Sequence, residues 1–329
     1  MPRYGFNFLW MFGHGPAEAA DERALDFLVE TGFTFVRIPT DYRLWTKKFD
    51  YQHPDERVLS VIDSYLQACS SRGLHLSLNL HRAPGYCINN NDLERDNLWL
   101  DEVAQEAFVF LWETFTQRYA GVPSELLSFD LVNEPPHVGQ YGLTRDNHEA
   151  LMRRTVAAIR ALDPQREIVL DGLGCGHLAM PELADLGVVH SGRGYEPMAV
   201  SHHAADWWPD AATAPVPEYP GLEWNGRTWD RDVIRDFYQP WREVEARGTS
   251  VHIGEFGCYS KTPNDVALRW FADLLGVYRE FGWGYGLWNF TGDFGIVRHG
   301  RPGARYEKLH GFDVDRELLD LLIANRVAS

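Results

Sequence analysis

Short runs of β-forming residues alternate with longer helical patterns along this chain, and that alternation limits the folds open to it. The β runs cover 5–9, 33–39, 74–81, 126–134, 167–172, 198–203, 250–257 and 284–290. Helical spacing is predicted over 17–32, 55–73, 98–119, 145–164, 181–186, 231–248, 262–282 and 316–328. Strands separated by helices are joined by crossover connections, so they are expected to run parallel.

Eight such units favour a closed barrel over an open sheet. An open sheet that binds nucleotides typically carries a glycine-rich loop after its first strand, but the segment FLWMFGHGP contains no GxGxxG pattern. No linker or low-complexity stretch divides the 329 residues, and barrels of about 250 residues or more fold as one domain. We therefore expect an α/β protein with a single (β/α)8 TIM-barrel catalytic domain over 1–329.

Charge and apolar content argue against several kinds of partner. The net charge of −16 disfavours nucleic acid and anionic membranes. No apolar run reaches 18 residues, and the first residues lack the pattern of a secretory signal. The expected location is the cytoplasm, unless a signal has been removed. The four cysteines match no zinc-binding spacing, and the sequence does not indicate an oligomeric state.

Polar and aromatic side chains stand at the ends of the predicted strands. In a (β/α)8 barrel the carboxyl ends of all strands meet at one rim, where active sites lie. The residues expected at this rim are Arg37, His81, Asn133, Glu134, His202, His203, Glu255, Trp288 and Asn289, while Asn7 lies inside the first strand. Each alone has an ordinary structural explanation, such as an ion pair of Arg37 with Asp41, so the prediction of a site depends on the group.

Two glutamates at one rim suit the cleavage of a glycosidic bond. Glu134 stands at the end of the fourth predicted strand and Glu255 near the end of the seventh. A retaining glycosidase needs one protonated carboxyl to donate to the leaving oxygen and one carboxylate to attack the anomeric carbon, with the two groups roughly 5–5.5 Å apart. Asn133, beside the first glutamate, is placed to hold the sugar 2-hydroxyl. No metal or other cofactor is needed.

The motifs LVNEP and IGEFG, about 120 residues apart, resemble the acid/base and nucleophile signatures of glycoside hydrolase family 5, the cellulase-like retaining glycosidases. The resemblance runs from GFNF to LWNFTGDFGI. It implies Glu134 as acid/base and Glu255 as nucleophile. It also implies supporting roles for Arg37, His81, Asn133 and His202, and a sugar-stacking role for Trp288.

One position departs from the family pattern. The family usually has a tyrosine two residues after the histidine of the sixth strand, and this tyrosine contacts the nucleophile. With His202 as that histidine, the corresponding residue is Ala204. His203 and Tyr259 are the candidates to replace the tyrosine.

The loops after the strands are rich in residues that bind sugars. Aromatic rings stack on the C–H faces of sugars, and Trp207 and Trp208 open a long Pro- and Trp-rich segment, 204–230. Further candidates are Trp10, Trp45, Trp224 and Trp229 as stacking rings, and Asp41, Asn289 and Asp293 as hydrogen-bonding groups. The segment 204–230 is also placed to close one end of a cleft, which would favour exo action.

The expected substrate is a β-1,4-glucan, a cello-oligosaccharide or a related β-glycoside, as the resemblance implies. Two alternatives differ in kind. One is a metal-dependent barrel hydrolase using His14, His81, His137, His202 and His203, although the first strand lacks the HxH pair that such enzymes carry. The other is a non-catalytic carbohydrate-binding barrel that keeps the glutamates only for sugar contacts.

Overall fold

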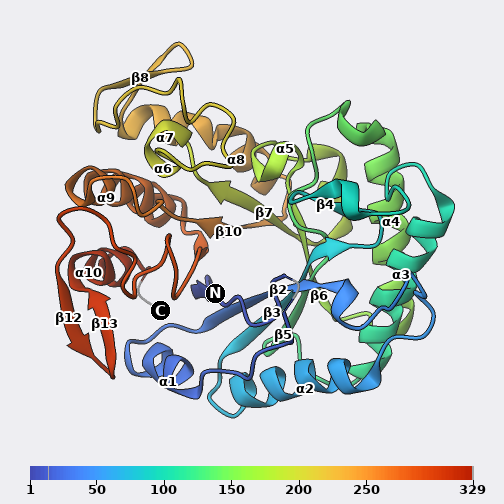
Figure 1. The fold of residues 1–329 in the computed structure, drawn as a ribbon. Coiled ribbons are helices and arrows are strands. Elements are labelled where there is room, and N and C mark those ends of the chain that lie inside the picture. The colour runs from blue at the N-terminus through green and yellow to red at the C-terminus, as the bar shows by residue number, and fades with distance from the viewer. Residues whose placement is uncertain (14, 328–329) are drawn as a thin grey trace.

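The computed structural model describes residues 1–13 and 15–327, which form a closed parallel barrel surrounded by helices (Figure 1). The eight barrel strands are β1 (Tyr4–Asn7), β2 (Phe35–Asp41), β3 (His75–Ala83), β5 (Leu127–Asp130), β6 (Glu167–Asp171), β7 (Val189–Gly194), β10 (Ser250–Phe256) and β11 (Gly284–Leu287). They pair in the order β2-β1-β11-β10-β7-β6-β5-β3, and a parallel pairing of β2 with β3 closes the ring. The predicted fold is confirmed.

The main helices follow the strands and form the outer ring of Figure 1. They are α1 (Glu22–Glu30), α2 (Glu56–Ser70), α3 (Glu102–Arg118), α4 (Arg145–Leu162), α7 (Arg231–Phe237), α8 (Gln239–Glu245), α9 (Asn264–Phe281) and α10 (Arg316–Ala324), with short α5 (Leu173–Gly176) and α6 (Met198–Ser201). Four 3-10 turns accompany them: η1 (Tyr42–Leu44), η2 (Asn91–Leu93), η3 (Gln140–Gly142) and η4 (Pro181–Leu186). Within the described part of the chain, no helix is apolar over a length that would cross a bilayer.

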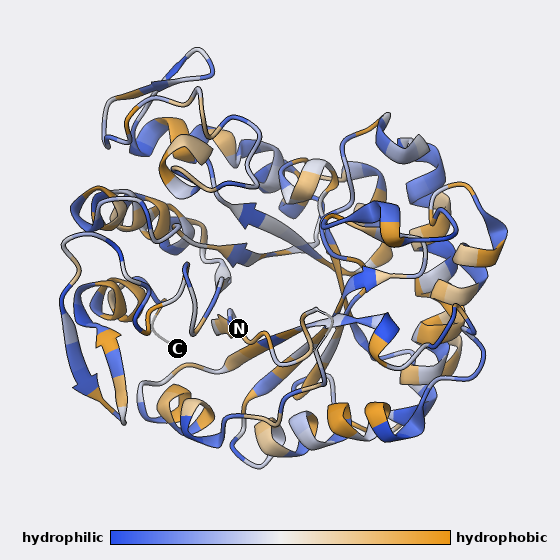
Figure 2. Ribbon diagram, in the orientation of Figure 1, coloured by the Kyte–Doolittle hydropathy of each residue, from blue (hydrophilic) through white to orange (hydrophobic). Residues whose placement is uncertain are grey.

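Local sequence signals explain where the helices begin. Asp21 and Asp55 cap α1 and α2 through their side chains, and Thr144 forms a capping box with Asn147 at the start of α4. Hydrophobic and hydrophilic residues alternate along α2, as Figure 2 shows, so one face packs on the barrel while the other meets water.

The structure corrects the sixth predicted strand. The strand is β7, over Val189–Gly194, whereas most of 198–203 forms the short helix α6 after Pro197. The segment VHSGRG was overlooked because serine, glycine and arginine replace the apolar residues of a typical buried strand. His202 and His203 therefore follow a helical turn and do not end a strand.

Other corrections concern breaks and hairpins. The helix predicted over 231–248 is divided into α7 and α8 at Tyr238, ahead of Pro240. The structure also contains elements that were not predicted: β4 (Tyr86–Cys87) and two antiparallel hairpins, β8 (Leu222–Trp224) with β9 (Arg227–Trp229) and β12 (Tyr306–Leu309) with β13 (Phe312–Asp315). The first hairpin lies inside 204–230 and projects from the edge of the molecule in Figure 1.

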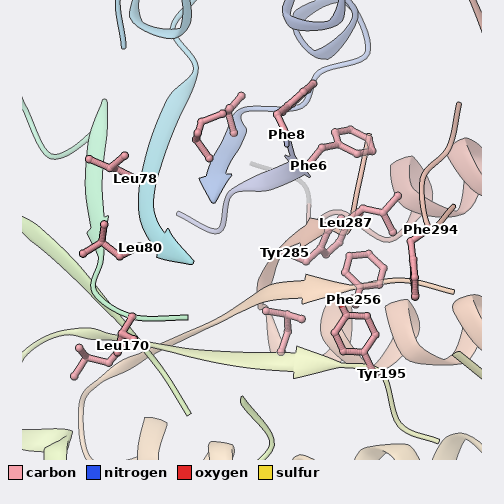
Figure 3. Packing of buried hydrophobic residues seen from close by; sticks show 14 of the residues in the cluster. Phe6, Phe8, Leu78, Leu80, Leu170, Tyr195, Phe256, Tyr285, Leu287 and Phe294 are labelled. Carbon is pink, nitrogen blue, oxygen red and sulfur yellow. The ribbon is translucent and has the colours of Figure 1, made fainter. Parts of the chain in front are cut away.

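The hydrophobic core lies mainly between the barrel and the helices. Figure 3 shows Phe6, Phe256, Tyr285 and Leu287 packed together, and Phe256 also meets Phe271 of α9 with ring centroids 6.0 Å apart. Alternate residues of the same strands point into the barrel, where many are polar. Inside the barrel, the amino end holds a cavity of about 340 Å³ that reaches up to Arg37 and Asp130. The strands thus separate an apolar outer layer from a polar interior.

Candidate active site

Inward-facing polar side chains from six strands meet at the carboxyl end of the barrel. They form one hydrogen-bonded network of Asn7, Arg37, Asp130, Asn133, Glu134, Asp171, Arg193 and Glu255. All except Glu134 are at least nine-tenths buried. The network brings together four residues predicted from the sequence, namely Arg37, Asn133, Glu134 and Glu255.

Arg37 of β2 binds the carboxyl group of Glu255. Its Nη1 donates to Oε1 of Glu255 at 2.5 Å, and its Nε donates to Oδ2 of Asp130 at 2.6 Å. Its Nη2 donates to Oδ1 of Asn133 at 2.9 Å. The guanidinium is therefore engaged with protein groups, and only 1% of Arg37 is exposed. Arg37 is therefore better placed to orient Glu255 than to contact a sugar directly.

Arg193 of β7 contacts both glutamates with one guanidinium. Its Nε donates to Oε1 of Glu134 at 2.8 Å, and its Nη2 donates to Oε1 of Glu255 at 3.2 Å. Because the guanidinium is small and planar, the two carboxyl groups that accept from its Nε and Nη2 lie close together at one mouth of the barrel. Asp171 of β6 holds the same guanidinium through Nη1 and Nη2.

Glu134 has a left-handed backbone conformation, with φ of 47°. A glutamate is strained in this region, and such strain persists only where neighbouring groups hold the backbone. The Glu134 amide donates to Oδ2 of Asp171 at 3.0 Å, and the Tyr86 hydroxyl donates to the Glu134 carbonyl at 2.6 Å. Burial, and then the nearby charge of Glu255, raise the pKa of Glu134 to about 7. Glu134 therefore keeps its proton close to neutral pH.

The tyrosine that seemed to be missing is Tyr195. Its hydroxyl donates to Oε2 of Glu255 at 3.1 Å. It stands two residues after Arg193, the last inward-facing residue of the sixth barrel strand. Once the sixth strand is placed over 189–194, the family spacing is restored with arginine in the position of the histidine. Neither His203 nor Tyr259 is needed in this role, and Ala204 lies in a separate turn.

His81 and Trp288 form one aromatic wall of the mouth. Their rings stack with centroids 5.8 Å apart, and the exposed ring of Phe12 meets both edge-on. Burial lowers the pKa of His81 to about 4, so its imidazole is neutral at pH 7. Asn289 follows Trp288 and is buried.

A second aromatic cluster stands beside Tyr195. Phe294 packs against Tyr195 and His202, with ring centroids 6.2 and 5.4 Å away (Figure 3 shows Phe294 near Tyr195). Trp207 lies over Tyr259 at 4.8 Å and is 58% exposed. Trp207 is thus open to a ligand.

The remaining predicted residues of this region differ in exposure. Trp208 is buried against Trp224, with ring centroids 5.7 Å apart, and so packs the loop. His203 is half-buried and lies outside the carboxylate network. Burial lowers the pKa of His202 to about 3 and also lowers that of His203.

Four members or neighbours of the network were not predicted from the sequence: Asp130, Asp171, Arg193 and Tyr195. A usable signal existed for three of them. Asp130, Asp171 and Arg193 each lie at or next to the last position of a predominantly buried strand, on the face that alternates with the outward apolar residues.

The described residues contain no cluster of three or more His, Cys, Asp or Glu side chains arranged to hold a metal ion. Of the histidines in the metal-dependent alternative, His81, His137, His202 and His203 therefore form no such group. His14 lies outside the described residues.

Comparisons with known proteins identify the family of this chain. The sequence pattern of the cellulase family (glycosyl hydrolase family 5) matches residues 4–293. Endoglucanase C of Acetivibrio thermocellus is 28% identical over 311 residues, which cover 87% of this chain and 88% of that protein. Cellodextrinase A of Ruminococcus flavefaciens is 25% identical over 272 residues, covering 79% and 75% of the two chains.

Solved structures show the same architecture. The crystal structure of a glycoside hydrolase is 63% identical, with a TM-score of 0.98 over 99% of this chain and all of that one. Endoglucanase Cel5A of Thermotoga maritima is 21% identical, with a TM-score of 0.78 over 97% of this chain and 96% of that one. At that identity the second comparison supports the fold alone.

Proposed function

Since this chain belongs to glycosyl hydrolase family 5, the cellulase family, and is a glycoside hydrolase, we propose that it cleaves β-1,4-linked gluco-oligosaccharides with retention at the anomeric carbon. Glu134 is the acid/base and Glu255 the nucleophile. The observation that carries this proposal is that one guanidinium, that of Arg193, contacts both carboxyl groups. Two carboxyl groups that bind one guanidinium are close enough to act on a single glycosidic bond.

In the first step, an ionised oxygen of Glu255 attacks C1 of the sugar. The bond from C1 to the leaving oxygen breaks, and its electron pair stays with that oxygen. Glu134 gives its proton to the same oxygen, which departs as an alcohol. The raised pKa of Glu134, about 7, keeps this proton available. Arg37 and Tyr195 hold the two oxygens of Glu255 in place for the attack.

In the second step, water releases the sugar from Glu255. Glu134, now ionised, takes a proton from the water while the water oxygen bonds to C1. The ester bond to Glu255 breaks, and its electron pair returns to the carboxylate. Two inversions at C1 give net retention, and the enzyme regains its starting protonation state.

The surfaces around the glutamates support an oligosaccharide as substrate. Trp288 and the exposed Phe12 contact each other at the mouth, and the exposed Trp207 belongs to the aromatic cluster beside Tyr195. Aromatic rings are suited to the C–H faces of pyranose sugars. Asn133 Nδ2 is buried and finds no partner among the described residues, so it is available for a sugar hydroxyl. The names of two relatives, endoglucanase C and cellodextrinase A, support β-1,4-glucan and short cello-oligosaccharides.

The nucleophile is tested by Glu255→Ala with added azide. We expect the variant to lose turnover of an aryl β-cellobioside, because no group attacks C1. Azide should restore turnover by entering the vacated space and should give an α-glycosyl azide, which product NMR identifies. A β-linked azide product from Glu255→Ala would contradict the assignment. So would an α-linked azide product from Glu134→Ala if azide does not rescue Glu255→Ala.

The acid is tested by Glu134→Ala with two substrates. An aryl glycoside with a good leaving group needs no proton in the first step, whereas a cello-oligosaccharide does. We therefore expect kcat/KM to fall far more for the oligosaccharide than for the aryl glycoside. Equal losses for both substrates would contradict the role of Glu134 as acid.

A further inference from the structure

We propose that Arg193 and Asp171 are positioning residues that together set the protonation of Glu134 in both halves of the reaction. This inference rests on the roles proposed above for Glu134 and Glu255. Neither residue was expected from the sequence, and in this chain an arginine stands where the family pattern has a histidine.

Contacts join the pair to both catalytic groups. Arg193 reaches Glu134 through Nε and Glu255 through Nη2. Asp171 holds the guanidinium through both of its oxygens and also accepts the backbone amide of Glu134. Arg193 and Asp171 are 0% and 1% exposed. The arginine therefore cannot turn to water, and its charge acts on the two glutamates at close range.

The position of Arg193 is fixed from several sides. Nη1 also donates to Oγ of Ser191 at 3.2 Å, and Nη2 donates to Oδ1 of Asn133 at 2.9 Å. A Cβ on Gly254 would lie 2.9 Å from Nη1, so the adjacent strand leaves no spare room. Such constraint on the guanidinium favours one orientation between the glutamates.

Other titratable and charged groups also face this region. Those that act electrostatically on Glu134, Arg193, Asp171 or Glu255 include Arg37, His81, Tyr86, Asp130, Cys175, His177, Tyr195 and His252. Only Arg193 makes a side-chain ion pair with Glu134 among the described residues. The arginine is therefore the positive charge with the most direct effect on the acid.

In the resting enzyme, the charges around Glu134 oppose one another. Burial and the charges of Glu255 and Asp171 raise the pKa of Glu134, whereas Arg193 lowers it. Asp171 offsets part of the arginine's charge. Without Asp171, Arg193 would favour loss of the proton from Glu134 before the first step, when the proton is needed.

After the first step, the balance reverses. Glu255 is then a neutral ester, so it no longer raises the pKa of Glu134 and no longer shares the charge of Arg193. The guanidinium, still held by Asp171, stabilises the carboxylate form of Glu134. That ionised form is the base required for attack by water. One fixed arginine thus serves both steps, because the charge of its other neighbour changes.

The test compares Arg193→Met with Asp171→Asn by the pH dependence of kcat/KM on a cello-oligosaccharide. The basic limb of this profile reports loss of the proton from the acid in the free enzyme. Arg193→Met should move the limb to higher pH, and Asp171→Asn should move it to lower pH, each by about one pH unit. Shifts in the same direction, or an unmoved limb in both variants, would overturn the proposal.

A matched pair of control variants is available at the other end of the barrel. Arg166 is a buried arginine just before β6, and its Nη2 donates to Oδ2 of Asp163 at 2.8 Å. Arg166→Met and Asp163→Asn make the same chemical changes away from the glutamates. We expect them to lower the thermal midpoint while leaving the basic limb at its wild-type pH. If Arg193→Met does not fold, the downward shift expected for Asp171→Asn still decides the matter.

A second readout follows the glycosyl-enzyme. With a good aryl leaving group, the second step limits turnover, so loss of Arg193 should slow kcat and cause the covalent species to accumulate in the mass spectrum. An Arg193→Met enzyme that deglycosylates at the wild-type rate would count against the proposed effect on the base. Azide rescue of Glu255→Ala separates the two proposals. If rescue succeeds while the pH shifts fail, only the present inference is lost.

Discussion

At the scale of single residues, the candidate site contains a few groups whose backbone conformation or burial is energetically unfavourable. Glu134 is strained at φ of 47° and is largely withdrawn from water, and Asp171 and Tyr86 hold its backbone. Two buried arginines compensate four nearby carboxyl groups. Burial also raises the pKa of Asp130 to about 7. A site with more acids than bases favours retention of a proton on at least one acid.

The raised pKa of Glu134 predicts a stability change in Glu134→Gln. The folded-state pKa, about 7, exceeds the ordinary value of 4.5. The protonated carboxyl therefore contributes stability that is complete below pH 4.5 and is lost as pH rises through 7. Glutamine cannot ionise, so the variant should gain stability relative to wild type across this window, by about 3 kcal/mol. Urea unfolding at several pH values measures this difference, and a difference that is constant with pH would contradict the prediction.

Tyr195→Phe tests the hydrogen bond to the nucleophile. A hydrogen bond to a charged group contributes about 1.5–3 kcal/mol, so its loss should reduce kcat/KM by roughly ten- to a hundred-fold. The decrease should be similar for good and poor leaving groups, because the change affects the attack and not the proton transfer.

Tyr285→Phe is the matched control for this change. It removes a buried hydroxyl that donates to the Leu322 carbonyl at 2.6 Å, away from the glutamates. Lower thermal stability with unchanged kcat/KM is expected. If the two variants lose equal activity, the special role of Tyr195 is refuted.

At the scale of elements, β7 and β10 place Arg193 and Glu255, the proposed nucleophile, side by side. Their parallel pairing aligns Arg193 with Glu255, and a register shift lies between Ile253 and Glu255. Glycines allow the strands and the guanidinium to approach closely. A Cβ on Gly254 would lie 2.5 Å from Ser191 Oγ and 2.9 Å from Arg193 Nη1. Strand β10 therefore needs glycine at this point to leave space for the arginine.

Gly254→Ala should damage activity more than its neighbour Gly192→Ala. The added methyl at Gly254 displaces Arg193 or Ser191, and overpacking typically costs about 1–3 kcal/mol. The methyl at Gly192 would lie 3.2 Å from the flexible end of Ile253 and 3.5 Å from the Trp241 ring, an ordinary van der Waals distance. We expect a loss of kcat/KM in Gly254→Ala beyond its loss of stability. Equal effects of the two substitutions on kcat/KM would show that Arg193 tolerates displacement.

At the scale of the whole molecule, the barrel fixes the mouth while one long insertion shapes its edge. The segment 204–230 begins beside the exposed Trp207 and continues into the β8–β9 hairpin, where Trp208 packs on Trp224. Ring contacts link Trp207 through Tyr259 and Phe294 to Tyr195, which donates to Glu255. The insertion thus starts next to the reacting centre.

This arrangement predicts exo action on cello-oligosaccharides. If the insertion closes one end of the cleft, products of one constant length should appear first from substrates of increasing length. Chromatography of early products from end-labelled substrates makes the measurement. Trp207→Ala should raise KM for the longer substrates without changing turnover of an aryl glycoside. Random internal cleavage would exclude exo action while leaving the proposed chemistry intact.

The sequence by itself determined the barrel and the two glutamates. Eight alternating units are sufficient to predict a closed parallel sheet, because each amphipathic helix must cover a strand and the strands must bury both faces. Glu134 and Glu255 were identified because polar residues that end apolar strands are conspicuous in the chain. A polar residue at the end of an apolar strand can be recognised from the sequence alone wherever the strand itself is correctly predicted.

Only the tertiary structure revealed the partners of those glutamates. Arg193 and Asp171 lie on different strands from Glu134 and meet it only when the barrel closes. The strand that carries Arg193 was not predicted, because it lacks the apolar residues of a typical buried strand. Its polar residues can be buried only when the carboxylates of neighbouring strands surround them. Tyr195 was missed for the same reason, since its place depends on that strand. Interactions between distant segments, rather than local preference, decided the electrostatics of the site.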